Sequence, residues 1–253
     1  MKKPKRLSLL ALVLASLFSA SSQAGSFSVT PVRFFFGPKD RAMAVTLENG
    51  GDSEIALQAD INQWTQDAAG VDKLELTEDM LVAPPVIKIP PRGKQVVRLA
   101  LLVPRDPSRQ MTYRMVVREV PEAVAVEGKV QLPVALAMNM PVFITPPGAQ
   151  REVACKLGSN PARKLEAVCS NSGTAYAQLR NVELKRGADT LASFDGSLYL
   201  LPGASKPLPI KASDGPAPAS GPAELVVTFD DLKPQSYPVT VPCGGGLDSS
   251  WLP

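Results

Sequence analysis

Short runs of apolar residues, many of them alternating with polar ones, follow one another along most of the chain and predict β-strands. In the first part of the chain the runs are Ser26–Phe36, Ala42–Leu47, Ile55–Trp64, Val86–Ile89, Gln95–Val103, Met111–Val120 and Val130–Ile144. Turn residues separate these runs. Glu48–Asp52 contains Asn-Gly-Gly and predicts a hairpin between its two neighbours. No helix of three turns is predicted, and only Thr77–Val82 fits a single helical turn.

A second series of shorter runs follows Pro146-Pro147-Gly148, where we place a domain boundary. Its members are Val153–Leu157, Leu165–Ser170, Ala175–Leu184, Leu191–Leu201, Leu208–Lys211, Leu225–Phe229 and Tyr237–Val241. About seven strands in about 100 residues is the size of an immunoglobulin-like sandwich. The pattern therefore predicts an all-β protein with two immunoglobulin-like β-sandwich domains in tandem. They are expected over residues 25–147 and 148–243, followed by a loose tail over residues 244–253.

The first 24 residues have the pattern of a secretory signal peptide. A basic start at residues 2–6 precedes the apolar stretch Leu7–Phe18, and Ser22-Gln23-Ala24 offers small residues for cleavage. This segment holds four of the 27 basic residues and none of the 24 acidic ones, which leaves 23 basic and 24 acidic residues and a net charge of −1. The charge therefore does not indicate a nucleic-acid partner. The apolar stretch is too short to span a bilayer, so we expect an exported protein without direct membrane insertion.

The composition excludes several kinds of catalytic and metal site. The chain contains no histidine, which rules out a Ser–His–Asp triad, a Cys–His pair and a histidine metal site. It also contains no glycine-rich phosphate loop, no EF-hand loop and no C-x-x-C motif. Carboxylate pairs capable of glycoside hydrolysis would arise by chance among 24 acidic residues. We therefore expect no enzymatic activity and no cofactor.

The three cysteines permit at most one internal disulfide. Cys155 and Cys169 flank the turn-like segment 158–162, so a hairpin centred there would bring them face to face. We favour this pair, because an exported protein meets an oxidising compartment. Cys243 is then left over. A metal site built from all three thiolates is the alternative, although their spacing matches no known zinc pattern.

The longest apolar run has an unusual regularity. Eight of its residues are apolar at every second position: Val130, Leu132, Val134, Leu136, Met138, Met140, Val142 and Ile144. A strand would place them all on one face and, at about 3.3 Å per residue, would be roughly 50 Å long. One interpretation is a core strand that bends at Pro133 or Pro141 and serves two sheets. The other is an exposed edge strand whose side chains fill a partner's groove by strand addition.

Several short motifs support the second interpretation. The first half contains Ser28-Val29-Thr30-Pro31-Val32-Arg33, Ala83-Pro84-Pro85-Val86-Ile87-Lys88-Ile89 and Tyr113–Pro121, and the second contains Asn171-Ser172-Gly173 and Leu201-Pro202-Gly203. Their order and spacing resemble the periplasmic pilus chaperones of the chaperone–usher pathway. The resemblance implies a periplasmic, two-domain immunoglobulin-like protein. It would hold pilus or fimbrial subunits by donor-strand complementation, block premature polymerisation and deliver each subunit to an outer-membrane usher.

The resemblance also implies binding residues. The donor strand would present Val130, Leu132, Val134, Leu136, Met138 and Met140 to the subunit. Arg33 matches the family arginine that anchors the subunit's terminal carboxylate, and a guanidinium suits that role because it can form two parallel hydrogen bonds. Pro141 stands where the family usually has a lysine, so Arg98 and Arg114 are the candidates for a second cation. The run Trp64-Thr65-Gln66 and the segment 140–143 are more similar to the divergent archaic branch.

Two other classes of protein fit the all-β pattern. A structural or adhesive surface protein, such as a pilus subunit, would carry a short donor extension at its N-terminus, whereas the apolar stripe here lies in mid-chain. A carbohydrate-binding sandwich would gather aromatic side chains on one face, but 14 aromatic residues are spread along the 253 positions. The chaperone is therefore the function that the sequence favours.

Overall fold

In a computed structural model, which describes residues 27–120, 135–160, 165–212 and 219–242, every regular element is a β-strand. The first ten are β1 (Phe27–Thr30), β2 (Phe34–Phe36), β3 (Ala42–Asn49), β4 (Ile55–Gln66), β5 (Asp72–Leu76), β6 (Met80–Ala83), β7 (Val86–Ile89), β8 (Lys94–Leu101), β9 (Met111–Glu119) and β10 (Ala137–Ile144). The others are β11 (Val153–Ser159), β12 (Leu165–Asn171), β13 (Ala177–Arg186), β14 (Asp189–Leu200), β15 (Ser205–Pro209), β16 (Lys211–Ala212), β17 (Gly221–Phe229) and β18 (Pro234–Val241). The all-β prediction is confirmed.

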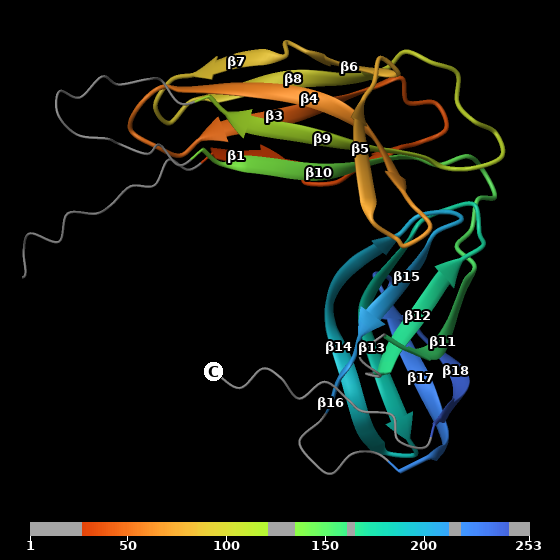
Figure 1. Ribbon diagram of the computed structural model, residues 1–253. Coiled ribbons are helices and arrows are strands. Elements are labelled where there is room, and N and C mark those ends of the chain that lie inside the picture. Colours follow the sequence, from red (N-terminus) through yellow and green to blue (C-terminus); the bar gives the residue numbers. More distant parts are fainter. Residues whose placement is uncertain (1–26, 121–134, 161–164, 213–218, 243–253) are drawn as a thin grey trace, which may run out of the picture.

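The first ten strands form one sandwich (Figure 1). One sheet has the order β1-β3-β8-β6, and the other has the order β2-β10-β9-β4-β5, with β7 also paired to β4. Their inward side chains alternate with outward ones, as the burial of Val45 and Leu47 in β3 and of Ile61 in β4 shows. These side chains form the first hydrophobic core between the two sheets.

The last eight strands form a second sandwich (Figure 1). A sheet with the order β11-β12-β15 faces a sheet with the order β16-β14-β13-β17-β18. The second core contains Ala167 and Leu208 from the smaller sheet and Leu179 and Leu225 from the larger one. The predicted pair of immunoglobulin-like sandwiches is thus the observed fold.

The predicted strand Ser26–Phe36 is wrong in one respect, because it consists of two strands in different sheets. β1 pairs with β3, whereas β2 pairs with β10 in the opposite sheet. Between them lies the segment Pro31–Arg33, which begins with a cis Thr30–Pro31 bond. Proline has no N–H for the ladder, so pairing ends there and the chain crosses over. The change of sheet places Arg33 immediately before β2.

The predicted hairpin at Glu48–Asp52 is also wrong, since β3 and β4 belong to opposite sheets. The side chain of Asn49 is buried and donates hydrogen bonds to the carbonyl oxygens of Ser53 (2.7 Å), Ile89 (3.1 Å) and Pro90 (3.1 Å). Its own oxygen accepts from the N–H of Gly51 (2.9 Å). These bonds tie the crossing segment to the β7–β8 turn. Likewise the segment 77–82 contains the start of strand β6, not a helical turn.

Cys155 and Cys169 lie opposite each other in β11 and β12 and form a disulfide, with sulfur atoms 2.01 Å apart. Both thiols are therefore engaged with each other and not with a metal. Cys243 lies outside the described residues. Within the described ranges there is no cluster of three or more His, Cys, Asp or Glu side chains suited to a metal ion. In the same ranges no helix has the length and apolar character needed to cross a membrane.

Candidate functional site

The strand β10 has a free hydrogen-bonding edge over part of its length. It pairs with β9 over Ala137–Ile144, but with β2 only over Val142–Ile144. Over residues 137–141 the edge opposite β9 therefore has no strand partner among the described residues. Pro141 immediately precedes the segment paired with β2, a position that tolerates a residue without an N–H. This free edge can accept an additional strand.

The predicted donor residues have different positions relative to this edge. Val130, Leu132 and Val134 lie outside the described residues, and the strand of the structure begins at Ala137, later than the predicted Val130. Leu136 precedes it and is 42% exposed, and its carbonyl oxygen accepts from the N–H of Glu119 (2.9 Å).

Two further predicted donor residues belong to the protein's own core. Met138 is partly buried against the first core. Met140 is buried inside it, directly opposite Met115 of β9. In this structure the side chain of Met140 is occupied in the protein's own core, and its contact with a subunit stays a prediction. The backbone of residues 137–141 thus has a free edge, while the apolar side chains Met138 and Met140 of the same segment pack against or inside the protein's own core.

Arg33 and Arg114 flank Pro141 on the outer face of this sheet. Arg114 of β9 lies opposite Pro141 in the register of the pair β9–β10. Arg33 immediately precedes β2, whose first residue, Phe34, pairs with Val142, so it lies next to the Pro141 end of that pairing. Phe34 and Met115 point into the core, so their neighbours Arg33 and Arg114 point outward. Arg33, Pro141 and Arg114 thus form a row across this end of the sheet.

The guanidinium of Arg114 lies between aromatic rings. Its central carbon is 3.6 Å from the ring centroid of Trp64 and 5.3 Å from that of Tyr199, which are cation–π contacts. Burial lowers the pKa of Arg114, and the negative charge of Asp72 acts in the opposite direction. Arginine stays protonated at neutral pH despite such a shift. The side chain is therefore a partly buried positive charge held in a fixed orientation.

Arg33 is held by a different contact. Its Nη1 donates to the side-chain oxygen of Gln178 in β13 at 2.9 Å. Among the described residues, no carboxylate lies within salt-bridge distance of Arg33 or Arg114. Arg98 lies in β8, in the opposite sheet, and its side chain is exposed. The structure therefore places Arg33 and Arg114 on either side of β10 and Arg98 in the opposite sheet.

An aromatic cluster joins the two sandwiches beside this row. Phe143 of β10 stacks on Tyr176 with ring centroids 4.0 Å apart, and it also contacts Trp64 (6.1 Å) and Tyr199 (5.9 Å). Phe35 lies at its edge, 5.5 Å from Phe143, and is 48% exposed. We call these five residues, Phe35, Trp64, Phe143, Tyr176 and Tyr199, the junction cluster. Two of the arginine contacts described above are made to it.

Sequence reasoning missed most of the junction cluster. Trp64 is fully buried, but it packs in the second core although its strand belongs to the first sandwich. Phe143 likewise packs in the second core although its strand belongs to the first sandwich. It is the one large apolar residue on the otherwise small or polar face of the 130–144 run, and this exception in the sequence could have pointed to its role.

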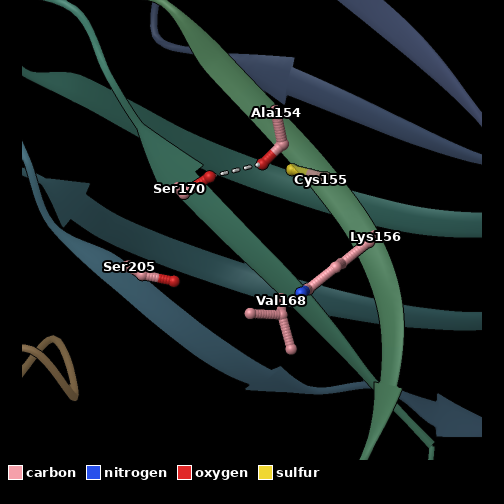
Figure 2. A pocket seen from close by; sticks show the side chains of 6 residues that line it. All are labelled: Ala154, Cys155, Lys156, Val168, Ser170 and Ser205. Carbon is pink, nitrogen blue, oxygen red and sulfur yellow. Dashed lines mark hydrogen bonds between the residues drawn. The ribbon is translucent and has the colours of Figure 1, made fainter.

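A shallow hollow of about 220 Å³ lies elsewhere, on the sheet β11-β12-β15 (Figure 2). It is lined by Ala154, Cys155, Lys156, Val168, Ser170 and Ser205, and the hydroxyl of Ser170 donates to the carbonyl oxygen of Ala154 across it (3.4 Å). None of its lining residues belongs to the junction cluster or to the free edge of β10. It is therefore separate from the candidate site.

Comparison with known proteins agrees with this architecture. Residues 26–150 match the family model of the pili and flagellar-assembly chaperone, PapD N-terminal domain. Through this segment, which includes β1–β10, the chain belongs to the pilus-assembly chaperones. No curated protein sequence matches the chain.

The fold as a whole is similar to that of solved chaperone structures. One is the CsuC–CsuE chaperone–tip subunit pre-assembly complex from archaic Csu pili of Acinetobacter baumannii, at 18% identity and a TM-score of 0.62 over 85% of this chain and 98% of the other. Another is the CupB2 chaperone of Pseudomonas aeruginosa, at 17% identity and a TM-score of 0.54 over 85% of this chain and 100% of the other. A third is the Salmonella enterica SafA pilin–SafB chaperone complex, at 14% identity and a TM-score of 0.55 over 87% of this chain and 98% of the other. These likenesses extend through the second sandwich.

Proposed function

We propose that the chain is a periplasmic chaperone that binds pilus or fimbrial subunits by donor-strand complementation and delivers them to an outer-membrane usher. The observation that carries this proposal is the free edge of β10 over residues 137–141. In the sequence it is preceded by the apolar alternation from Val130 to Leu136. An unprotected edge of this kind promotes aggregation unless a partner strand covers it. The proposal includes a signal peptide over residues 1–24 and a domain division between residues 147 and 148.

Strand addition supplies both affinity and selectivity for incomplete subunits. Backbone hydrogen bonds along the edge bind any extended segment, while alternating aliphatic side chains bind only a subunit with an open groove. Each aliphatic side chain transferred from water contributes about 1.5–3 kcal/mol before the cost of ordering both partners. A complete subunit has no open groove, so exchange with another subunit's strand can release it without nucleotide hydrolysis. The Cys155–Cys169 disulfide suits the oxidising periplasm.

We further propose that Arg33 and Arg114 together bind the carboxylate at the C-terminus of the subunit. Both guanidinium groups lack a carboxylate partner among the described residues, and both flank β10 where its free edge ends. A half-buried guanidinium that is not paired with a carboxylate pays part of its desolvation cost, and an incoming carboxylate relieves that cost. The position of Pro141 between the two arginines then explains why no lysine is needed on β10.

Capture of subunits is tested by a pull-down of the tagged protein from the periplasm of its own source cell, with mass spectrometry of what is recovered. We expect the wild type to recover a small exported β-rich protein, and Leu136→Arg to lose it because a charge enters the donor stripe. Leu81→Arg is the matched control, since Leu81 is 48% exposed in the opposite sheet. All three proteins must show the same folded circular dichroism spectrum. Equal recovery by the three, or none by the wild type, would favour the structural surface-protein alternative.

The carboxylate anchor is tested with two fluorescein-labelled peptides of alternating valine and serine, one ending in a free carboxylate and one in an amide. The ratio of their dissociation constants, measured by fluorescence anisotropy, reports the anchor separately from strand addition. We expect the wild type to bind the acid roughly tenfold more tightly, because hydrogen bonds between charged groups are the strong ones. Arg33→Ala and Arg114→Ala should each bring the ratio close to one. Arg98→Ala should leave it unchanged, and an equal loss in that variant would contradict the assignment.

A further inference from the structure

The second sandwich contacts both arginines through a single pair of neighbouring residues. Gln178 of β13 lies directly opposite Tyr199 of β14 in the antiparallel register. The oxygen of Gln178 accepts from Arg33 (2.9 Å), and the ring of Tyr199 lies 5.3 Å from the guanidinium carbon of Arg114. The cross-strand pair Gln178–Tyr199 of the second sandwich therefore contacts both Arg33 and Arg114 of the first sandwich.

The spacing of this pair differs from the spacing of the arginines. β10 lies between Arg33, which directly precedes β2, and Arg114 of β9, so their backbones are about 10 Å apart at the usual distance between strands. The side chains of a directly opposed cross-strand pair start only about 4.5–5.5 Å apart. Long side chains that begin about 10 Å apart and end on such a pair can converge over Pro141. Convergence of this kind brings two guanidinium groups within reach of one carboxylate.

We propose that Gln178 and Tyr199 are positioning residues that hold Arg33 and Arg114 at the spacing required to bind one carboxylate group. This inference rests on the proposed function and deepens it. Both cations come from the first sandwich and both positioning side chains come from the second. The carboxylate site is consequently complete only when the two sandwiches are docked.

Gln178 is itself fixed in orientation. Its side chain is 3% exposed, and its Nε2 donates to the hydroxyl of Ser197 at 2.5 Å. Its backbone oxygen accepts from the N–H of Asp230 at 3.0 Å. Because the amide nitrogen is engaged by Ser197, the amide oxygen faces Arg33. A buried amide satisfied on both sides cannot rotate freely, which makes it a suitable support for a charged side chain.

The two supports leave hydrogen-bond donors available on both arginines. A guanidinium has five N–H donors in one plane. The bond to Gln178 uses Nη1 of Arg33, so Nε and Nη2 remain available for a ligand. Arg114 contacts Trp64 and Tyr199 through ring faces, a contact that does not use its in-plane N–H groups. Each arginine can therefore be held in place and still bind an oxygen.

The test uses the full-length protein and the two valine–serine peptides described above. We expect Gln178→Ala to reduce the acid-to-amide ratio from roughly tenfold to threefold or less while the affinity for the amide peptide stays the same. Tyr199→Leu should act similarly, and Tyr199→Phe should retain the ratio because the ring remains.

Gln110→Ala is the matched control for Gln178→Ala. Gln110 is a buried glutamine that also links the two sandwiches, since it accepts from the backbone N–H of Tyr176 (2.9 Å) and donates to Thr145 (2.5 Å). It has no hydrogen bond to either arginine among the described residues. The two alanine variants should lose comparable amounts of thermal stability, whereas only Gln178→Ala should lose discrimination between acid and amide.

Three results would overturn the proposal. The first is an unchanged ratio in Gln178→Ala and Tyr199→Leu when the wild type discriminates. The second is an equal fall in Gln110→Ala, which would mean that the docking of the sandwiches matters and Gln178 has no specific role. The third is a failure of the wild type to bind either peptide. That result alone would count against strand capture itself, so it is distinguishable from the first two.

Discussion

Two buried asparagines have the same structural role in the two sandwiches. Asn49 ends β3, and its side chain forms four hydrogen bonds to the backbone of the crossing segment and the β7–β8 turn. Asn171 ends β12 and is equally buried. It donates to the carbonyl oxygens of Ala175 (2.8 Å) and Leu200 (3.0 Å) and accepts from the N–H groups of Glu152 (3.1 Å) and Gly173 (3.0 Å). At both sites a glycine follows two residues later and donates to the asparagine oxygen.

Asn49→Ala tests this role. We expect the substitution to lower the free energy of unfolding by about 3 kcal/mol, because several backbone groups lose their partner in a place that water does not reach. Chemical denaturation measures the change. Asn62→Ala is the control, since Asn62 lies in β4 of the same sandwich, is partly exposed and has no side-chain hydrogen bond among the described residues. A loss below about 1 kcal/mol, or an equal loss in the control, would assign the stability of the crossing to other contacts.

At the scale of strands, the sequence could predict which segments are extended but not how they pair. Alternation in Ile55–Trp64 and Met111–Val120 identifies strands because each has one buried face, and β4 and β9 are indeed strands. Pairing depends on contacts far apart in the sequence. The Asn-Gly-Gly segment therefore suggested a local hairpin, whereas β3 and β4 belong to opposite sheets.

The candidate site shows the same division between local and distant information. Arg33 and Arg114 were both candidates from the sequence, and Arg98 was equally plausible there, because nothing local says which sheet a strand joins. The structure separates them by topology, since β8 and β9 lie in different sheets. The sequence singles out Phe143 by its face of the 130–144 run, but it could not show that Trp64, Tyr176 and Tyr199 join it, because the four residues come from strands or strand ends of both sandwiches.

At the scale of the whole molecule, the two sandwiches share packing at their junction. Trp64 and Phe143 extend from strands of the first sandwich but are buried in the second core. The side chain of Gln66 adds two hydrogen bonds to the backbone of the second sandwich. Its Nε2 donates to the carbonyl oxygen of Tyr199 (2.9 Å), and its Oε1 accepts from the N–H of Leu201 (2.9 Å). A site built from both sandwiches requires this fixed geometry, so we expect the protein to unfold as one cooperative unit.

Substitutions at two adjacent residues of β10 can distinguish a loss of coupling between the sandwiches from a simple loss of stability. Val142 and Phe143 are both fully buried, but Val142 packs in the first core and Phe143 in the second. Removing the Phe143 ring should destabilise the contact between the sandwiches by about 3–5 kcal/mol. Differential scanning calorimetry should show one transition for the wild type, two for Phe143→Ala, and a single transition at lower temperature for Val142→Ala, which weakens only one core. Two transitions in the wild type would mean that the sandwiches are energetically independent. One transition in Phe143→Ala would mean that the polar contacts suffice to couple them.

If the coupling through Phe143 is real, the same variant should also lose discrimination between acid and amide peptides, because Arg33 and Arg114 would no longer meet Gln178 and Tyr199.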